Sequence, residues 1–488
     1  MKTWIRLGLM SLAVAMMACN PEVEDPTDED GEEGTPAATG EIEVPTDTVW
    51  NHTVTVVYNG SSATVTIDAD SVTYTVDGGD VTINSKAKNI EYSASGSGSG
   101  SLKIYSDYRY KLILNSLTLT SSGKPVINNQ GKKSLFLNLV GTSTLSDSNG
   151  YATETSDKED QKAAVFSEGQ IYILGNGQLT LAGKNKHAIA SDDFIMMQSG
   201  TVNITAATTD GVHANDAFQM DGGTLNISAT DEGIAVDEGT VAINGGNITI
   251  ATTGTTAKGI KSYSDLAIAG GNIVISAPHG TKSGGSEGIE SKAVVSITGG
   301  NIVVDSYDDG INAGGDLTIS GGYLYVHATN NDGIDANGNC YIKGGVIVAI
   351  SAGSPEVAID ANTEEQKKLY VSGGVLFTIG GLESGASLTQ TCYSASSWSK
   401  STWYSMTIGS DTYAFLTPSS GGSTLVVSGS SQPTLKSGVT VSGGTSILNG
   451  NAYLNATVSS GSNVTLSTYT PSSGGPGGGG PGGGGGWH

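Results

Sequence analysis

The chain repeats one pattern at intervals of about 23 residues, and this repeat limits the available folds more than any other feature. Asp309-Gly310-Ile311 returns as Asp332-Gly333-Ile334. Between such motifs stand a short segment such as LTI, a Gly-Gly pair, and a second segment such as TLNIS or NITIA. Each segment alternates with period two and is too short for a helix. The glycines that end the pairs recur at steps of 22 to 29 residues: Gly177, Gly200, Gly223, Gly246, Gly271, Gly300, Gly322, Gly345 and Gly374.

These repeats predict an all-β fold, namely a right-handed parallel β-helix with three short strands per coil of about 23 residues and a C-terminal β cap. Each strand would pair with its equivalent in the next coil, about 4.8 Å away. A β-propeller is excluded because its blades need about 40 residues. One inward column of aliphatic side chains is expected from Val212, Ile234, Ile260, Ile289, Ile311, Ile334 and Ile359.

Composition divides the chain into six segments. Residues 1–18 place Lys2 and Arg6 before an apolar run and predict a lipoprotein signal peptide, with Cys19 as the lipidated residue. A cleaved signal in which Cys19 has no role is the alternative. We expect an exported lipoprotein at the outer membrane or cell surface, or on the periplasmic face, held to the membrane by its lipid alone. The remaining segments are an acidic disordered tether (19–48), an N-terminal β region with the first coils (49–150), the regular β-helix (151–380), a C-terminal β cap (381–470) and a Gly-rich disordered tail (471–488).

The net charge of the chain limits the classes of molecule that it can bind. A net charge of -24 excludes nucleic acid, because phosphates would be repelled. We expect a monomer. Cys340 falls on a core-facing position, so we predict a buried thiol there, with a disulfide to Cys392 as the alternative in an exported protein.

Two polar columns flank the aliphatic column, one before each glycine and one after each isoleucine. We expect both on one outer face, toward solvent or a groove. Carboxylates stacked about 4.8 Å apart repel by about 3–4 kcal/mol at an effective dielectric constant near 20. Calcium, which accepts six to eight oxygens, would neutralise them; ordinary Asp-Gly turn chemistry is the alternative. The predicted calcium ligands are Glu287, Glu290, Asp309, Asn312, Asp332 and Asp335.

An aromatic strip is the predicted sugar-binding feature. Tyr323, Tyr325 and His327 alternate along one strand, at positions expected to point outward. Exposed rings on a flat sheet stack on the apolar faces of sugars. Packing beneath the C-terminal cap is the alternative.

With these features, the chain resembles the exported carbohydrate-binding parallel β-helix proteins typified by a clostridial cellulose- and polygalacturonate-binding protein, which are similar to pectate lyases. The resemblance covers about residues 100 to 450 and rests on 158–193, the Asp-Gly-Ile repeats, "EGIESK" (287–292) and 413–429. It implies calcium and polysaccharide binding, with pectic or cellulosic chains as the leading ligands.

The leading hypothesis is therefore a surface lipoprotein that binds polysaccharide, assisted by calcium and without catalysis. A structural adhesin or stalk is one alternative. The other is a calcium-dependent pectate-type lyase, which needs a base to remove a sugar C5 proton. Arg109 is the only arginine after the signal and lies upstream of the acids, so Lys261 is the candidate base. An ion pair of Lys261 with Glu290, or with acids near Asp237, is the competing interpretation.

Overall fold

The computed structural model describes residues 42–46, 48–152, 159–281 and 284–472, all within one compact unit, Thr35–His488. The predicted signal peptide, Cys19, most of the predicted tether and nearly all of the predicted tail lie outside the described residues. Within the described residues, no helix is both long enough and apolar enough to cross a lipid bilayer.

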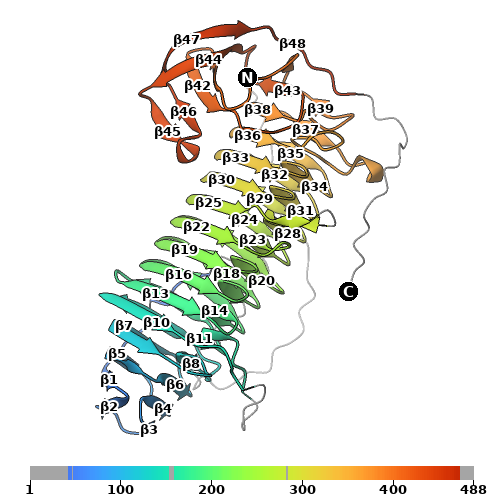
Figure 1. Cartoon of the computed structure of the whole chain (residues 1–488). Coiled ribbons are helices and arrows are strands. Elements are labelled where there is room, and N and C mark those ends of the chain that lie inside the picture. The colour runs from blue at the N-terminus through green and yellow to red at the C-terminus, as the bar shows by residue number, and fades with distance from the viewer. Residues whose placement is uncertain (1–41, 47, 153–158, 282–283, 473–488) are drawn as a thin grey trace, which may run out of the picture. The chain divides into compact units, whose positions relative to one another are not determined.

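The described chain is all-β, as predicted. Its only helices there are two short 3-10 turns, η1 (Thr363–Glu365) and η2 (Leu448–Gly450). Most strands belong to three ladders in which successive strands pair in parallel (Figure 1). Ladder A is a separate sheet of β3 (Val72–Asp77), β4 (Asp80–Ser85), β6 (Ser101–Ser106), β8 (Ile127–Asn129), β11 (Ala163–Ser167), β14 (His187–Ser191), β17 (Val212–Ala214), β20 (Ile234–Val236), β23 (Lys258–Ser262), β28 (Glu287–Ser291), β31 (Ile311–Ala313) and β34 (Ile334–Ala336); only its β3–β4 pair is antiparallel.

Two further ladders share the largest sheet and are joined by β7, which pairs with both β9 and β10. Ladder B consists of β9 (Leu135–Val140), β12 (Ile171–Gly175), β15 (Phe194–Met197), β18 (Ala217–Met220), β21 (Thr240–Ile243), β24 (Leu266–Ile268), β29 (Val295–Ile297), β32 (Leu317–Ile319), β35 (Cys340–Ile342), β37 (Leu369–Val371) and β39 (Ser387–Leu388). Ladder C consists of β7 (Tyr110–Thr120), β10 (Thr142–Ser146), β13 (Gln178–Gly183), β16 (Thr201–Ala207), β19 (Thr224–Ala229), β22 (Asn247–Thr252), β25 (Asn272–Ala277), β30 (Asn301–Ser306), β33 (Tyr323–Ala328), β36 (Val346–Ile350) and β38 (Val375–Ile379).

The same sheet continues at both ends of the ladders. β1 (His52–Gly60) pairs antiparallel with β2 (Ser62–Ile67) and parallel with β5 (Ile90–Ser99), which pairs with β7. At the other end, β43 (Leu425–Ser428) runs antiparallel to β38 and to β40 (Cys392–Ala395), which pairs with β48 (Ser467–Thr468). β26 (Gly280–Thr281) and β27 (Gly284–Gly285) form a separate small hairpin.

The predicted aliphatic column is present. Val212, Ile234, Ile260, Ile289, Ile311, Ile334 and Ile359 are paired in sequence, each with its equivalent in the next coil. All of these side chains are buried. Burying such a side chain contributes about 1.5–3 kcal/mol, so the column supplies much of the driving force for stacking one coil on the next.

The glycine corners follow the predicted register with one exception. From Gly200 to Gly374 the eight predicted corner glycines have φ between 84° and 93°, a region that side chains with a Cβ rarely adopt. At the first corner the positive φ belongs to Gly175, at 95°, and not to Gly177. A Cβ on Gly322 would also lie 2.8 Å from the carbonyl oxygen of Gly299, so close backbone approach adds to the requirement.

The C-terminal region forms a six-stranded antiparallel sheet that packs against ladder C. Its strands are β41 (Trp403–Ile408), β42 (Asp411–Leu416), β44 (Thr434–Ser442), β45 (Thr445–Ile447), β46 (Ala452–Leu454) and β47 (Thr457–Val464). The backbone N–H of Leu448 donates to Oδ1 of Asn301 at 2.8 Å, and Tyr404 shares an apolar cluster with Val348.

Cys340 and Cys392 are both buried and both free. The predicted buried thiol at Cys340 is therefore confirmed. Burial raises the pKa of both thiols, which keeps them protonated at neutral pH.

Candidate functional site

A groove of about 750 Å³ runs past the carboxyl ends of five strands of ladder A, from β20 to β34, and reaches η1. Adjacent strands lie about 4.8 Å apart, so these ends span about 19 Å. The groove crosses one coil after another and is therefore suited to a linear ligand laid along the stack.

The register of the repeat explains which residues line the groove. Half of them occupy the position three residues after the buried aliphatic residue of each coil: Asp237, Tyr263, Lys292, Gly314, Asn337 and Asn362. Others occupy the position directly after it: Lys261, Glu290 and Asn312. Sequence analysis found the second of these columns and missed the first. Extending the register by two residues along each coil would have found it.

Tyr263 is the exposed aromatic residue of the groove. It follows β23 directly, and 62% of its surface is accessible to solvent. An exposed ring next to a polar groove provides an apolar face on which a sugar ring can stack. This tyrosine was missed because it stands alone in its column and does not alternate with other aromatic residues along a strand.

Hydrogen-bonding groups line the same groove. Nζ of Lys261 lies 3.6 Å from Oε1 of Glu232, and the ammonium group of Lys292 pairs with the carboxylate of Glu290. The side-chain amide of Asn337 donates to Oδ1 of Asn312 at 3.3 Å. The groove thus offers cations, amides and carboxylates together, and these are the groups that bind sugar hydroxyls or sugar acids.

Only two of the six predicted calcium ligands, Glu290 and Asn312, line the groove. Four of the acids are buried, so the predicted exposure to solvent is wrong for them, although Glu290 does line a groove as the prediction allowed. Their exposed fractions are 9% for Glu287, 5% for Glu290, 5% for Asp309 and 8% for Asp332. Asp335 is half-buried.

Hydrogen bonds connect part of this column to the groove. Asn312 donates through Nδ2 to Oδ2 of Asp309 at 3.2 Å, and the backbone N–H of Asp332 donates to Oδ1 of Asp309 at 3.1 Å. Oδ1 of Asp332 accepts the backbone N–H of Val357 at 2.5 Å. Oε2 of Glu287 and Oε2 of Glu290 are buried without a hydrogen-bond partner in the described chain.

Burial dominates the electrostatics of these acids. It raises the pKa of Glu287 to about 7, although Lys258, 2.8 Å away, lowers it. Burial raises the pKa of Asp335 to about 6 and that of Asp332 to about 8. For Asp309, burial and then the charges of Asp335 and Glu287 raise the pKa well above the usual value. Such a column is stable at neutral pH only with bound protons or with a cation.

The predicted exposure of the aromatic strip is wrong. Tyr325 is only 6% exposed and belongs to the apolar cluster beneath the six-stranded sheet, and Tyr323 packs against that cluster. His327 is half-buried, with Nδ1 3.0 Å from Oδ1 of Asp305. The alternating pattern correctly placed these residues on one face, but that face is covered by a sheet formed about 80 residues later in the chain.

Lys261 does line the groove, with 34% of its side chain exposed. Its backbone pairs with that of Glu290 in the next coil, as the repeat predicted. Its ammonium group, however, forms its ion pair with Glu232 in the preceding coil.

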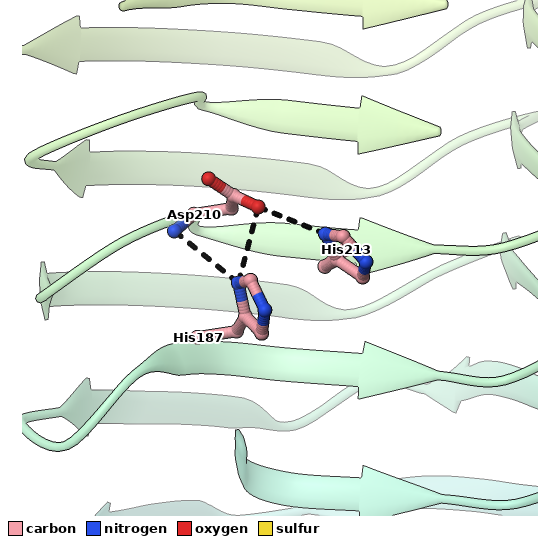
Figure 2. Close-up of side chains that lie close together, drawn as sticks. All are labelled: His187, Asp210 and His213. Atoms are coloured by element: carbon pink, nitrogen blue, oxygen red, sulfur yellow. Dashed lines mark hydrogen bonds and ion pairs between the residues drawn. The ribbon is translucent and has the colours of Figure 1, made fainter. Parts of the chain in front are cut away.

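Sequence analysis also missed a cluster of His187, Asp210 and His213 in ladder A (Figure 2). Among the described residues, three groups of acids and histidines bring three ligand atoms within 4.8 Å of one another. The other two groups are Asp160, Glu168 and Asp192, and Asp210, Asp231 and Glu232. None of the six predicted calcium ligands belongs to any of these groups.

The comparisons with known proteins address the family directly. Among solved structures, the chain is similar to a polysaccharide lyase-like protein from C. thermocellum, solved as a gadolinium derivative, with 21% identity and a TM-score of 0.39 over 49% of this chain and 100% of that one. No curated protein matches the chain. Residues 77–333, more than half of the 488 residues, match the family described as "Carbohydrate-binding domain-containing protein". The chain therefore belongs to this family of carbohydrate-binding domain-containing proteins.

Proposed function

We propose that the chain binds a polysaccharide along the groove past β20 to β34, with Tyr263 as the stacking platform. The observation that carries the proposal is the 62% exposed ring of Tyr263 beside a groove lined by lysines, amides and carboxylates. Sugar rings need both an apolar face and hydrogen-bonding groups. Membership of a carbohydrate-binding family supports the same function.

The ligand class proposed is pectic or cellulosic. A uronate polymer would be bound through the ammonium groups of Lys261 and Lys292, and through calcium held by the acid column. A neutral glucan would need only the ring of Tyr263 and the amides of the groove. Removal of calcium therefore separates the two classes: binding of a uronate should weaken in chelator, whereas binding of a glucan should not change.

Calcium is proposed for the acid column on the grounds of its donor set. Buried carboxylates with raised pKa values and two unpartnered oxygens, on Glu287 and Glu290, are the hard oxygen ligands that calcium prefers. When bound, calcium would neutralise the column and could bridge to a sugar acid. The six predicted ligands do not converge on one point, so Glu287 and Glu290 are the pair we favour.

The remaining expectations form part of the same proposal. Three parallel ladders of equivalent strands suit a right-handed parallel β-helix, with the six-stranded sheet as its cap. An exported lipoprotein attached through Cys19 would present the groove to polymers outside the cell. A monomer suffices for this function.

The direct test uses affinity electrophoresis of the full chain in gels that contain polygalacturonate, pectin or a soluble cellulose derivative. One of these polymers should retard the protein. Tyr263→Ala should weaken binding roughly tenfold, equal to about 1.4 kcal/mol. Tyr74→Ala is the matched control, because Tyr74 is also an exposed tyrosine, at 45%, but lies on β3 outside the groove. Equal retardation of both variants would contradict the proposal that the groove is the binding site. If no polymer retards the protein, the function as a stalk or adhesin is favoured.

A lyase is the second candidate because Lys261 lies in the groove with its side chain partly exposed. Its ion pair with Glu232 must open before Lys261 could remove a proton. Incubation with polygalacturonate and calcium decides between the functions. Release of unsaturated uronates by the wild type, lost in Lys261→Ala, would establish a lyase, whereas binding without release supports the non-catalytic function.

A further inference from the structure

The His187, Asp210 and His213 cluster arises from the repeat itself. His187 and Asp210 each stand two residues before the buried aliphatic residue of their coil, so they are equivalent residues one coil apart. His213 directly follows the aliphatic residue Val212 in the same coil as Asp210. Stacking of the two coils therefore brings both imidazoles to one carboxylate, as Figure 2 shows.

The ligand atoms converge on one point. Oδ2 of Asp210 lies 3.1 Å from Nδ1 of His187 and 2.8 Å from Nδ1 of His213. The two rings stack with their centroids 4.2 Å apart and their planes 22° from parallel. Side-chain exposure is 5% for His187, 7% for Asp210 and 14% for His213, so the cluster is largely shielded from water.

Neighbouring groups orient the three side chains. The backbone N–H of Glu232 donates to Oδ1 of Asp210 at 3.2 Å, which fixes the carboxylate with Oδ2 toward the histidines. Nε2 of His213 lies 3.4 Å from Oδ2 of Asp237, a residue of the groove. A carboxylate on the far ring nitrogen is the usual support of a metal-bound histidine, because it fixes the ring and its tautomer.

Three groups lie within hydrogen-bond distance of Nδ1 of His187. Oγ1 of Thr209 is 2.9 Å away, Oδ2 of Asp210 is 3.1 Å away, and the backbone nitrogen of Asp210 is 3.4 Å away. Depending on its tautomer, this ring nitrogen donates a proton to an oxygen or presents a lone pair. When it presents a lone pair, that lone pair and Oδ2 of Asp210 face each other, which is the arrangement that a cation would bridge.

We propose that Nδ1 of His187, Nδ1 of His213 and Oδ2 of Asp210 bind a transition-metal ion of the Zn²⁺ or Co²⁺ type. Two imidazoles and one carboxylate form a known kind of zinc donor set, with bonds of about 2.0–2.2 Å. To reach the spacing of a tetrahedral site, each Nδ1 atom must move only a few tenths of an ångström away from Oδ2 of Asp210. Imidazole donors select against calcium, so this site differs from the acid column in both place and chemistry. Through Asp237, the ion would also stiffen one end of the groove.

The test begins with full-length protein stripped of metal by chelator. Titration with Co²⁺ should give one equivalent of bound ion with the visible absorption of a four-coordinate site, displaced by Zn²⁺ and not by Ca²⁺. His187→Gln and His213→Gln should each weaken binding by about 100-fold or more, since even loss of a supporting group costs roughly 10–100-fold. His327→Gln is the matched control, because His327 contacts a single carboxylate, Asp305, at 3.0 Å and should bind Co²⁺ as the wild type does.

Far-UV circular dichroism of the metal-free variants shows whether they fold. X-ray absorption of the Co²⁺-loaded wild type does not depend on any variant, and should show two imidazole ligands. No Co²⁺ uptake by the wild type, a spectrum without imidazole scattering, or equal affinity in all variants would each overturn the proposal.

Discussion

The ammonium group of Lys292 pairs with the carboxylate of Glu290 two residues earlier, and so neutralises an acid that is only 5% exposed. The other carboxylate oxygen, Oε2, has no hydrogen-bond partner in the described chain. Stability at this point of the groove therefore depends on one exposed lysine.

Lys292→Ala should lower the free energy of unfolding by about 1–3 kcal/mol, because it leaves a buried carboxylate without its counter-charge. Adding Glu290→Gln in the same chain should recover part of this loss, since the buried charge is then absent. Urea unfolding of both variants at neutral pH measures the difference. A double variant less stable than Lys292→Ala would contradict this account.

The acid column predicts an unusual pH dependence for metal-free protein. Asp335, Glu287 and Asp332 have pKa values of about 6, 7 and 8, all raised first by burial above the value of about 4 expected in an unfolded chain. A carboxyl group whose pKa is raised by folding contributes stability fully below its unfolded pKa, and this contribution is lost as the pH rises through the folded pKa. The free energy of unfolding should therefore fall between about pH 4 and about pH 8.

Asp332→Asn tests the cause of this fall, because it removes a titrating group and keeps an oxygen to accept the N–H of Val357. At about pH 8 the variant should be more stable than the wild type by at least about 1.4 kcal/mol, the equivalent of one pKa unit. Chemical unfolding at about pH 5 and about pH 8 gives the comparison. Parallel pH profiles for both proteins would show that Asp332 does not titrate in this range.

Calcium should reduce the dependence of the free energy of unfolding on pH. If Glu287 and Glu290 hold the ion, saturating calcium should raise the midpoint of thermal unfolding near pH 8 and have little effect near pH 5, where the acids hold protons. Glu287→Gln should remove the calcium effect, whereas Glu238→Gln, at an exposed position outside the column, should keep it. Calorimetric calcium titrations that fail to distinguish these variants would place calcium elsewhere.

The two kinds of tyrosine should respond in opposite ways. Tyr325→Ala should cost about 3 kcal/mol or more of stability, because a large side chain is lost from beneath the six-stranded sheet, but should leave sugar affinity unchanged. Tyr263→Ala should change stability by no more than about 0.5 kcal/mol and lower affinity. Thermal unfolding and polysaccharide affinity, measured on the same samples, distinguish the roles. Loss of affinity in a correctly folded Tyr325→Ala variant would indicate instead that the aromatic strip on β33 binds the sugar.

The periodicity of the sequence predicted the features that depend on contacts between neighbouring coils, namely strand register and corner conformation. The register of Ile234 with Ile260, and the positive φ of Gly223, follow from a repeat that is visible in the sequence. Packing of Tyr325 beneath the cap was only the alternative prediction, because the sheet that covers it lies outside the repeat. The cluster of His187, Asp210 and His213 was within reach, because these residues occupy the positions of the two polar columns in the coils of Ile189 and Val212.

The ion-pair partners and the burial of individual side chains were less predictable than the strand register. The repeat placed Lys261 beside Glu290, and the backbones do pair, but the ammonium group extends to Glu232 in the other direction. A long flexible side chain chooses among partners one coil above and one coil below, and sequence spacing alone does not separate them. Burial of Glu287 and Asp309 similarly depends on the bulk of adjacent coils.

Hydrogen–deuterium exchange with and without the polysaccharide that binds most tightly tests the central claim most directly. The account predicts ligand-dependent protection of the backbone amides at the turns of Asp237, Tyr263, Lys292 and Gly314, which line the groove on successive coils. It predicts no change in β33, beneath the six-stranded sheet. Protection confined to β33, or to the outer face of ladder B around the half-buried Tyr341, would show that the polymer binds elsewhere and that the groove is not the binding site.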